Sequence, residues 1–124
     1  MIGSNDFDFS FSGLKSSVLR EVEKKTPDEQ MVNDICFAVQ NSIVEVIVRK
    51  TFKAAKKYGV KSILLGGGVA ANQALRDKLA SSIPLFAPPR NLCTDNGAMI
   101  AAAAFYNYKE VPWKSVNADP SLYF

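Results

Sequence analysis

The stretch KSILLGGGVAANQALRDKLASSIPLF, Lys61 to Phe86, decides the fold. Its first five residues are typical of a short buried strand, and the glycines that follow lead into a pattern typical of a helix. IPLFAPP, Ile83 to Pro89, is typical of a second short strand followed by a proline-rich loop. A strand, a helix and a strand in this order predict parallel pairing through a right-handed crossover, and hence an α/β layer.

A long helix is expected before this unit. Thr26, Pro27 and Glu29 match a capping box, and apolar residues from Val32 to Ile47 keep a three-and-four spacing. Gly59 suits a left-handed cap at the end of the helix. About 30 residues at about 1.5 Å each give a rod of about 45 Å, so we expect the helix to be kinked or to pack on something outside this chain.

The flanking segments predict less regular structure. Asp6 to Gly13 alternates polar and aromatic residues, which indicates a short strand or an extended lead-in, with Ser12 capping the next helix. Ala98 to Tyr106 is typical of an alanine-rich helix, and the tail after it is irregular, with Trp113 expected to pack back. Because two short strands are marginal in water, we expect a piece of a larger fold or a chain that completes its sheet by association.

Composition favours one soluble globular domain, since 48% of the 124 residues are hydrophobic and 22% are charged. The N-terminal residues do not resemble a secretory signal, and the longest apolar run is far shorter than the roughly 20 residues that span a bilayer. Cys36 and Cys93 lack the CxxC spacing of a zinc site. We therefore expect a cytoplasmic location and no membrane partner.

Basic residues gather between Val46 and Arg76, a range that contains no acid although the net charge of the chain is only +3. One interpretation is a face that meets RNA phosphates. The other is a solvated helix end whose cations complement the negative end of the helix dipole. The members of this segment are Arg49, Lys50, Lys53, Lys56, Lys57, Lys61 and Arg76.

The three glycines Gly66 to Gly68 lie between a predicted strand and a predicted helix, where bare backbone and helix N–H groups can approach a nucleotide. The stretch is neither a P-loop nor a dinucleotide fingerprint, so those mechanisms do not transfer. Asn72 offers a hydrogen-bond donor and an acceptor to a phosphate, ribose or base. The alternatives are a tight turn for the glycines and a helix cap for Asn72.

Asp95 has a similar ambiguity. An aspartate at a helix start normally accepts backbone N–H bonds, but Thr94 and Asn96 beside it supply more polar groups than capping requires. Its other interpretation is a metal or substrate ligand. The chain contains no histidine, which rules out a Cys-His pair built on Cys93 within it.

Four segments together resemble one family: DFSFSGLK (Asp8 to Lys15), AAKKYGVKSILL (Ala54 to Leu65), GGGVAANQALR (Gly66 to Arg76) and CTDNGAMIA (Cys93 to Ala101). In order and spacing they are similar to the C-terminal part of the tRNA threonylcarbamoyladenosine transferases. The family was formerly described as a peptidase, but this sequence contains no pair of a nucleophile and a base that would support that activity.

The resemblance implies the second lobe of an actin-like, hexokinase-like and Hsp70-like fold, with a short, mostly parallel sheet, a long helix and an alanine-rich helix. It implies transfer of threonylcarbamoyl from its adenylate to N6 of the tRNA adenosine next to the anticodon, with release of AMP. By position, Gly67, Gly68 and Asn72 match residues that approach the adenylate. Asp95 matches the aspartate that binds iron or zinc.

The resemblance also implies what this sequence lacks. The family's other metal ligands are two histidines in a first lobe, so we expect residues 1–108 to be a lobe fragment, inactive by itself, and 109–124 to be an irregular tail. Gly97 stands where alanine is expected. The implied partners are an N-terminal lobe in cis or trans, tRNA and accessory proteins of tRNA modification.

Two alternatives remain open. One is a non-catalytic relative that forms a homodimer or binds another partner through its long helix and exposed sheet edge. The other is a kinase or ATPase of the same superfamily, which needs acidic magnesium and phosphate loops that this sequence lacks.

Overall fold

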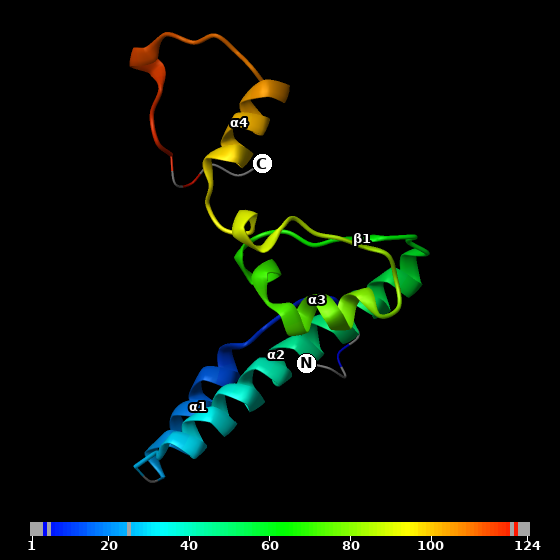
Figure 1. Cartoon of the computed structure of the whole chain (residues 1–124), viewed down its shortest axis with the longest axis vertical. Coiled ribbons are helices and arrows are strands. Elements are labelled where there is room, and N and C mark those ends of the chain that lie inside the picture. Colours follow the sequence, from blue (N-terminus) through cyan, green and yellow to red (C-terminus); the bar gives the residue numbers. More distant parts are fainter. Residues whose placement is uncertain (1–3, 5, 25, 120, 122–124) are drawn as a thin grey trace.

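The computed structural model describes residues 4, 6–24, 26–119 and 121. Figure 1 shows a body built from helices α1 to α3 and the strands, with α4 and the tail lying apart from it. The elements in chain order are α1 (Ser12–Glu23), α2 (Glu29–Tyr58), β1 (Ile63–Leu64), η1 (Gly68–Ala71), α3 (Gln73–Ala80), β2 (Leu85–Phe86), η2 (Arg90–Leu92), α4 (Gly97–Tyr106) and η3 (Trp113–Ser115), where η denotes a 3-10 helix.

The sheet is the parallel pair predicted from the sequence. Ile63 of β1 lies opposite Leu85 of β2, and Leu64 lies opposite Phe86. Helix α3 forms the connection between the two strands, so the α/β class is confirmed in this helix-rich form. Over the described residues the sheet has these two strands and no third.

The core lies between α2, α3 and one face of the sheet. Val44 of α2 and Leu75 and Leu79 of α3 are buried at its centre. Half-buried apolar side chains surround them: Ile47, Val48, Phe52, Ile63, Leu65, Ala74 and Leu85. Because strand side chains alternate between faces, Leu64 and Phe86 point the other way and are 83% and 60% exposed. The outer face of the sheet is therefore apolar and uncovered by the described residues.

Helix α2 runs unbroken for 30 residues and ends as predicted at Gly59, which adopts the left-handed conformation with φ 62°. Its beginning differs from the expectation. Asp28 is the cap, because its Oδ1 accepts a hydrogen bond from the Met31 backbone N–H at 2.8 Å, and Thr26 lies outside the helix. A carboxylate is the stronger acceptor at the positive end of the dipole.

By length and composition alone, α2 is also able to cross a membrane. One such helix is weak evidence, because the core helices of soluble proteins pass the same test. Part of the second half of this helix lies in the core, where Val44, Val46 and Ala55 are buried. In Figure 1, α3 lies across this second half and α1 lies along the first half.

Of the two alternatives for Asp6 to Gly13, the strand is absent, and a lead-in without regular secondary structure precedes the helix. Two other local expectations are wrong. Ser12 is the first helical residue rather than the cap. The Ser12 hydroxyl lies 3.2 Å from the Ser10 hydroxyl, and no described side chain caps α1. Trp113 does not pack back, since it is 79% exposed. Parts of the expected 109–124 tail lie outside the described residues.

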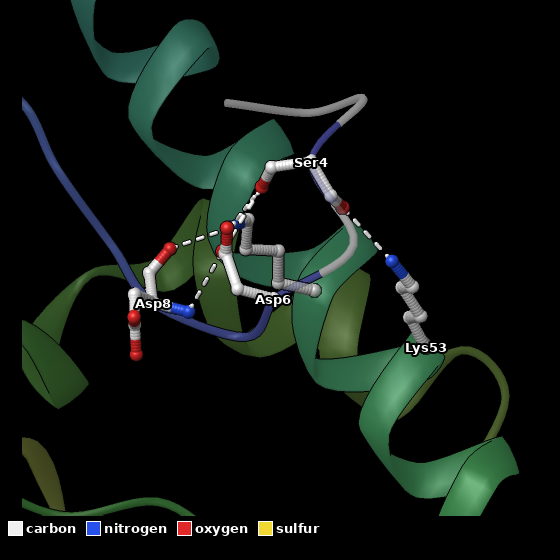
Figure 2. A network of polar contacts seen from close by, with 5 residues as sticks. Ser4, Asp6, Asp8 and Lys53 are labelled. Carbon is white, nitrogen blue, oxygen red and sulfur yellow. Dashed lines mark hydrogen bonds and ion pairs between the residues drawn. The ribbon is translucent and has the colours of Figure 1, made fainter.

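The segment from Ser4 to Asp8 is held against α2 by a buried lysine instead of by strand pairing. Lys50 is 3% exposed, and its Nζ donates to Asp6 Oδ1 at 2.6 Å, to Ser4 Oγ at 3.0 Å and to the backbone oxygen of Asp8. Lys53 donates to the Ser4 backbone oxygen at 2.9 Å. Figure 2 shows the Ser4 hydroxyl, the Asp6 carboxylate and the backbone oxygen of Asp8 facing a common centre, with Lys53 further along the helix. These bonds fasten the lead-in to the second half of α2.

This network predicts a pH-dependent stability. The hydrogen bond from Lys50 lowers the pKa of Asp6 from 3.8 to about 2. Because the folded-state pKa lies below the unfolded one, the stabilisation is present above about pH 4 and is lost as the pH falls towards 2. Asp6→Asn should lower the unfolding midpoint at pH 5, and this deficit should shrink as the pH approaches 2. A deficit of constant size from pH 5 to pH 2 would contradict the assignment; Asp34→Asn, on an exposed turn of α2, is the control.

Candidate functional site

The glycine turn lies directly after β1, as predicted. Gly67 has φ 82° and ψ 174°, a backbone conformation that is essentially restricted to glycine. Its carbonyl accepts from the Ala70 N–H at 3.0 Å and so starts η1, which leads into α3. The turn therefore keeps the chain bare of side chains between the strand and the helix, since Gly66 and Gly68 flank Gly67.

Asn72 is the cap of α3, so the capping interpretation is correct for one end of its amide. Its Oδ1 accepts from the Leu75 N–H at 3.0 Å. Its Nδ2 donates to Gln40 Oε1 of α2 at 3.2 Å. An asparagine amide carries two donors and two acceptor sites, so one of each remains for a ligand. Capping and ligand binding are thus compatible at this residue.

Arg76 connects three segments that the sequence analysis treated separately. Its Nε donates to the Ala70 carbonyl in η1, and its Nη2 donates to the Pro88 carbonyl at 2.6 Å. The same Nη2 lies 3.0 Å from the Sγ of buried Cys93. The guanidinium thereby holds η1 next to the segment that follows β2, in agreement with the contact between η1 and η2. The sequence showed only a positive charge at this position.

Asp95 does not cap α4. Asn96 is the cap, because its Oδ1 accepts from the Met99 N–H at 2.9 Å and its Nδ2 donates to the Thr94 carbonyl at 2.8 Å. The Asp95 side chain is exposed and makes no hydrogen bond or ion pair with any described residue. Its carboxylate is therefore available to a ligand.

A metal does not fit the described residues alone, because they contain no group of three His, Cys, Asp or Glu side chains able to hold one. Catalytic metal sites typically use about three protein ligands. Asp95 can supply one carboxylate oxygen and nothing more. Any metal at this position would need ligands from outside this part of the chain.

The two predicted ligand segments leave the sheet at the same edge. Parallel strands place their carboxyl ends side by side, and the glycine turn follows β1 while the segment towards Asp95 follows β2. Ligands of open α/β sheets bind outside that edge. A cavity of about 670 Å³ between α1, α2 and the start of α3 is lined by Asn72 but not by Gly67, Gly68 or Asp95. Asn72 and Asp95 thus share an edge of the sheet without sharing this cavity.

Much of the basic segment is occupied within the protein. Arg49 pairs with Glu45 at 2.7 Å, and Lys50, Lys53 and Arg76 make the bonds described above. The Lys57 ammonium lies 5.0 Å from the centre of the Phe7 ring. Arg49, Lys53, Lys56, Lys57 and Lys61 nevertheless remain exposed. Of these, Lys56 and Lys61 make none of the contacts described above, so the RNA-facing interpretation rests on these two lysines near the end of α2.

The model of the tRNA N6-adenosine threonylcarbamoyltransferase family matches residues 2–102. The chain belongs to this family. It is 47% identical to the enzyme of this name from Moorella thermoacetica, over 95% of this chain and 37% of the relative. Identity to the Listeria welshimeri enzyme is 45%, over 98% of this chain and 39% of the relative. Identity to the Sorangium cellulosum enzyme is 49%, over 83% of this chain and 31% of the relative.

The predicted resemblance to the threonylcarbamoyltransferase family is thereby confirmed, and the relatives that the chain matches are named as transferases. The chain spans about a third of the length of the curated relatives it matches. The match includes the glycine turn, Arg76 and Asp95, since all three lie between residues 2 and 102. The roles of Gly67, Gly68, Asn72 and Asp95 stay predictions.

The contacts of Arg76 with Ala70, Pro88 and Cys93, here called the Arg76 clamp, predict the effect of replacing this arginine in the threonylcarbamoyltransferase segment. Arg76→Met removes part-buried hydrogen bonds to two backbone carbonyls, those of Ala70 and Pro88, and should cost about 2 kcal/mol of stability. It should also speed the labelling of Cys93 by a thiol reagent in a Cys36→Ser background, because the loop over Cys93 loses its anchor. Arg90→Met, which removes an exposed cation from the same region, is the control. Equal labelling rates in Arg76→Met and the parent protein would contradict the clamp.

Proposed function

We propose that this chain is the C-terminal part of a tRNA N6-adenosine threonylcarbamoyltransferase and forms one wall of its adenylate-binding cleft. The supporting observation is the family match over residues 2–102. In the reaction, N6 of a tRNA adenosine attacks the carbamoyl carbon of threonylcarbamoyl-adenylate, the bond to the phosphate oxygen breaks, and AMP leaves while N6 loses a proton. The chain belongs to the second lobe of an actin-like and Hsp70-like fold, with residues 1–108 as the lobe fragment and 109–124 as its tail.

The adenylate lies against the glycine turn. The turn permits close approach of the ligand because Gly66, Gly67 and Gly68 carry no side chain, and built Cβ atoms at these positions would meet open space. The start of the next helix adds N–H groups and positive dipole, which suit a phosphate. Asn72 contributes its remaining donor and acceptor to the nucleotide. These residues bind and orient the leaving group rather than react with it.

Asp95 supplies one ligand to the family's iron or zinc ion, whose other ligands come from the first lobe. When bound, such a metal acts as a Lewis acid. The role of this chain is limited to holding an unpartnered carboxylate at the edge of the sheet, close to the segment that Arg76 anchors. The whole site requires an N-terminal lobe, in cis or in trans, and the substrate tRNA meets the assembled protein. The proposal also includes a cytoplasmic location and, as partners, accessory proteins of the same tRNA modification.

Transfer activity tests the proposal through complementation. The chain alone should transfer no labelled threonylcarbamoyl to tRNA, whereas adding the part of the Moorella thermoacetica enzyme that it does not match should restore transfer. Asp95→Ala should lower the restored rate by about 100-fold or more, because even residues that only support a metal ligand cost about 10–100-fold. Gly97→Ala, two residues away with open space for the new Cβ, is the matched control. Turnover by the lone chain, or full activity of Asp95→Ala, would contradict the proposal.

A second candidate is a non-catalytic relative that dimerises. The exposed apolar face of the sheet, Leu64 and Phe86, and the fully exposed helix α4 favour it. Parallel sheets are normally covered on both faces, so a second copy is one means of covering this one.

Light scattering distinguishes this candidate. Under it, the wild-type chain scatters as a dimer of 13.6 kDa subunits, and Phe86→Ser scatters as a monomer because the substitution removes apolar area from the contact. Tyr108→Ser, on the exposed tail, should leave the dimer intact. A wild-type chain that is monomeric at all concentrations would exclude the candidate.

A further inference from the structure

The side chain of Asn72 is held from two directions. The Leu75 N–H bonds its oxygen within α3, and Gln40 of α2 accepts from its nitrogen. The first bond is local and would form in any capped helix. The second joins residues 32 positions apart in sequence and ties the amide to a different helix. Nothing in helix capping requires it.

We propose that Gln40 is a positioning residue, which acts through Asn72 by fixing the amide in the orientation that meets the adenylate. The inference rests on the proposed function, because it assumes that Asn72 meets a nucleotide. It adds a residue on α2 that the glycine motif does not include. Gln40 becomes part of the site although it lies far from the other site residues in the sequence.

The cavity of about 670 Å³ supports this role. Gln40 and Asn72 both line it, together with Lys15 and apolar side chains that include Phe11, Val39 and Val69. Sites for small molecules combine apolar walls with a few convergent polar groups. Here the polar groups gather beside the cap of α3, where η1 ends. An apolar recess therefore lies next to the Asn72 amide, although Gly67 and Gly68 do not line it.

The hydrogen bonds that the Asn72 amide can make explain why an acceptor at residue 40 matters. With Leu75 N–H on Oδ1 and Gln40 Oε1 on Nδ2, each end of the Asn72 amide keeps one free position. If the acceptor is removed, the nitrogen is released and the side chain is free to rotate about its cap bond. The ligand must then order the side chain itself, which weakens its binding.

The test uses AMP as the probe and amide NMR of the full chain as the readout. Gln40→Leu should raise the dissociation constant of AMP about 5-fold, the value of one ordinary hydrogen bond. Gln40→Glu should bind within about 2-fold of wild type, because its carboxylate accepts the same hydrogen. Gln30→Leu is the matched control: it removes the same type of side chain from the same helix, where Gln30 bonds only to Asp34 among the described residues.

A double-mutant comparison separates action through Asn72 from direct contact with AMP. In an Asn72→Ala background, Gln40→Leu should cause no further loss. Further loss there, a Gln40→Glu variant as weak as Gln40→Leu, or equal binding by Gln40→Leu and wild type would each overturn the inference while leaving the proposed function standing. If AMP caused no shifts of the amide NMR signals in the wild-type chain, the proposal that this chain forms one wall of the adenylate cleft would be contradicted, and this inference with it.

Discussion

The packing of α3 on α2 is the constraint on which the rest of the structure depends. Leu75 and Leu79 are almost fully buried against Val44, and this contact holds the crossover helix close to the two strands that it connects. Each strand is two residues long and has few hydrogen bonds of its own. The parallel pair therefore exists because the helix brings its ends together, and the sheet edge that carries the glycine turn exists because of the pair.

Polar contacts then fix the details that apolar burial leaves undetermined. Arg76 projects from α3 and bonds the backbone before the helix and the backbone after β2, so a single guanidinium sets the spacing of two loops. A lysine at position 76 would carry a single ammonium group instead of the planar guanidinium, whose separate nitrogens bond the two carbonyls. Lys50 does the corresponding work for the N-terminal lead-in. In both cases a buried or half-buried cation fixes an irregular segment on a helix, and the Arg76 contacts lie next to the candidate site.

The sequence predicted those features that depend on local chemistry. The parallel unit, the left-handed Gly59 and the glycine turn follow from residue types whose preferences are strong over a few positions. It failed at the caps of α1 and α2, where several neighbouring residues compete for the same backbone groups, and at Trp113, whose environment is tertiary. Asn72 was predicted as a ligand or a cap from its place at the start of a helix. The bond from Asn72 to Gln40 and the bonds from Arg76 to Pro88 and Cys93 were not predictable, because these partners lie 32, 12 and 17 residues apart in sequence.

Helix α4 has one further consequence. The sequence analysis predicted an alanine-rich helix here, and all ten residues of α4 are exposed and none of them is charged. A contiguous apolar surface of this kind marks a contact with another surface in native proteins, and it favours aggregation where it stays uncovered.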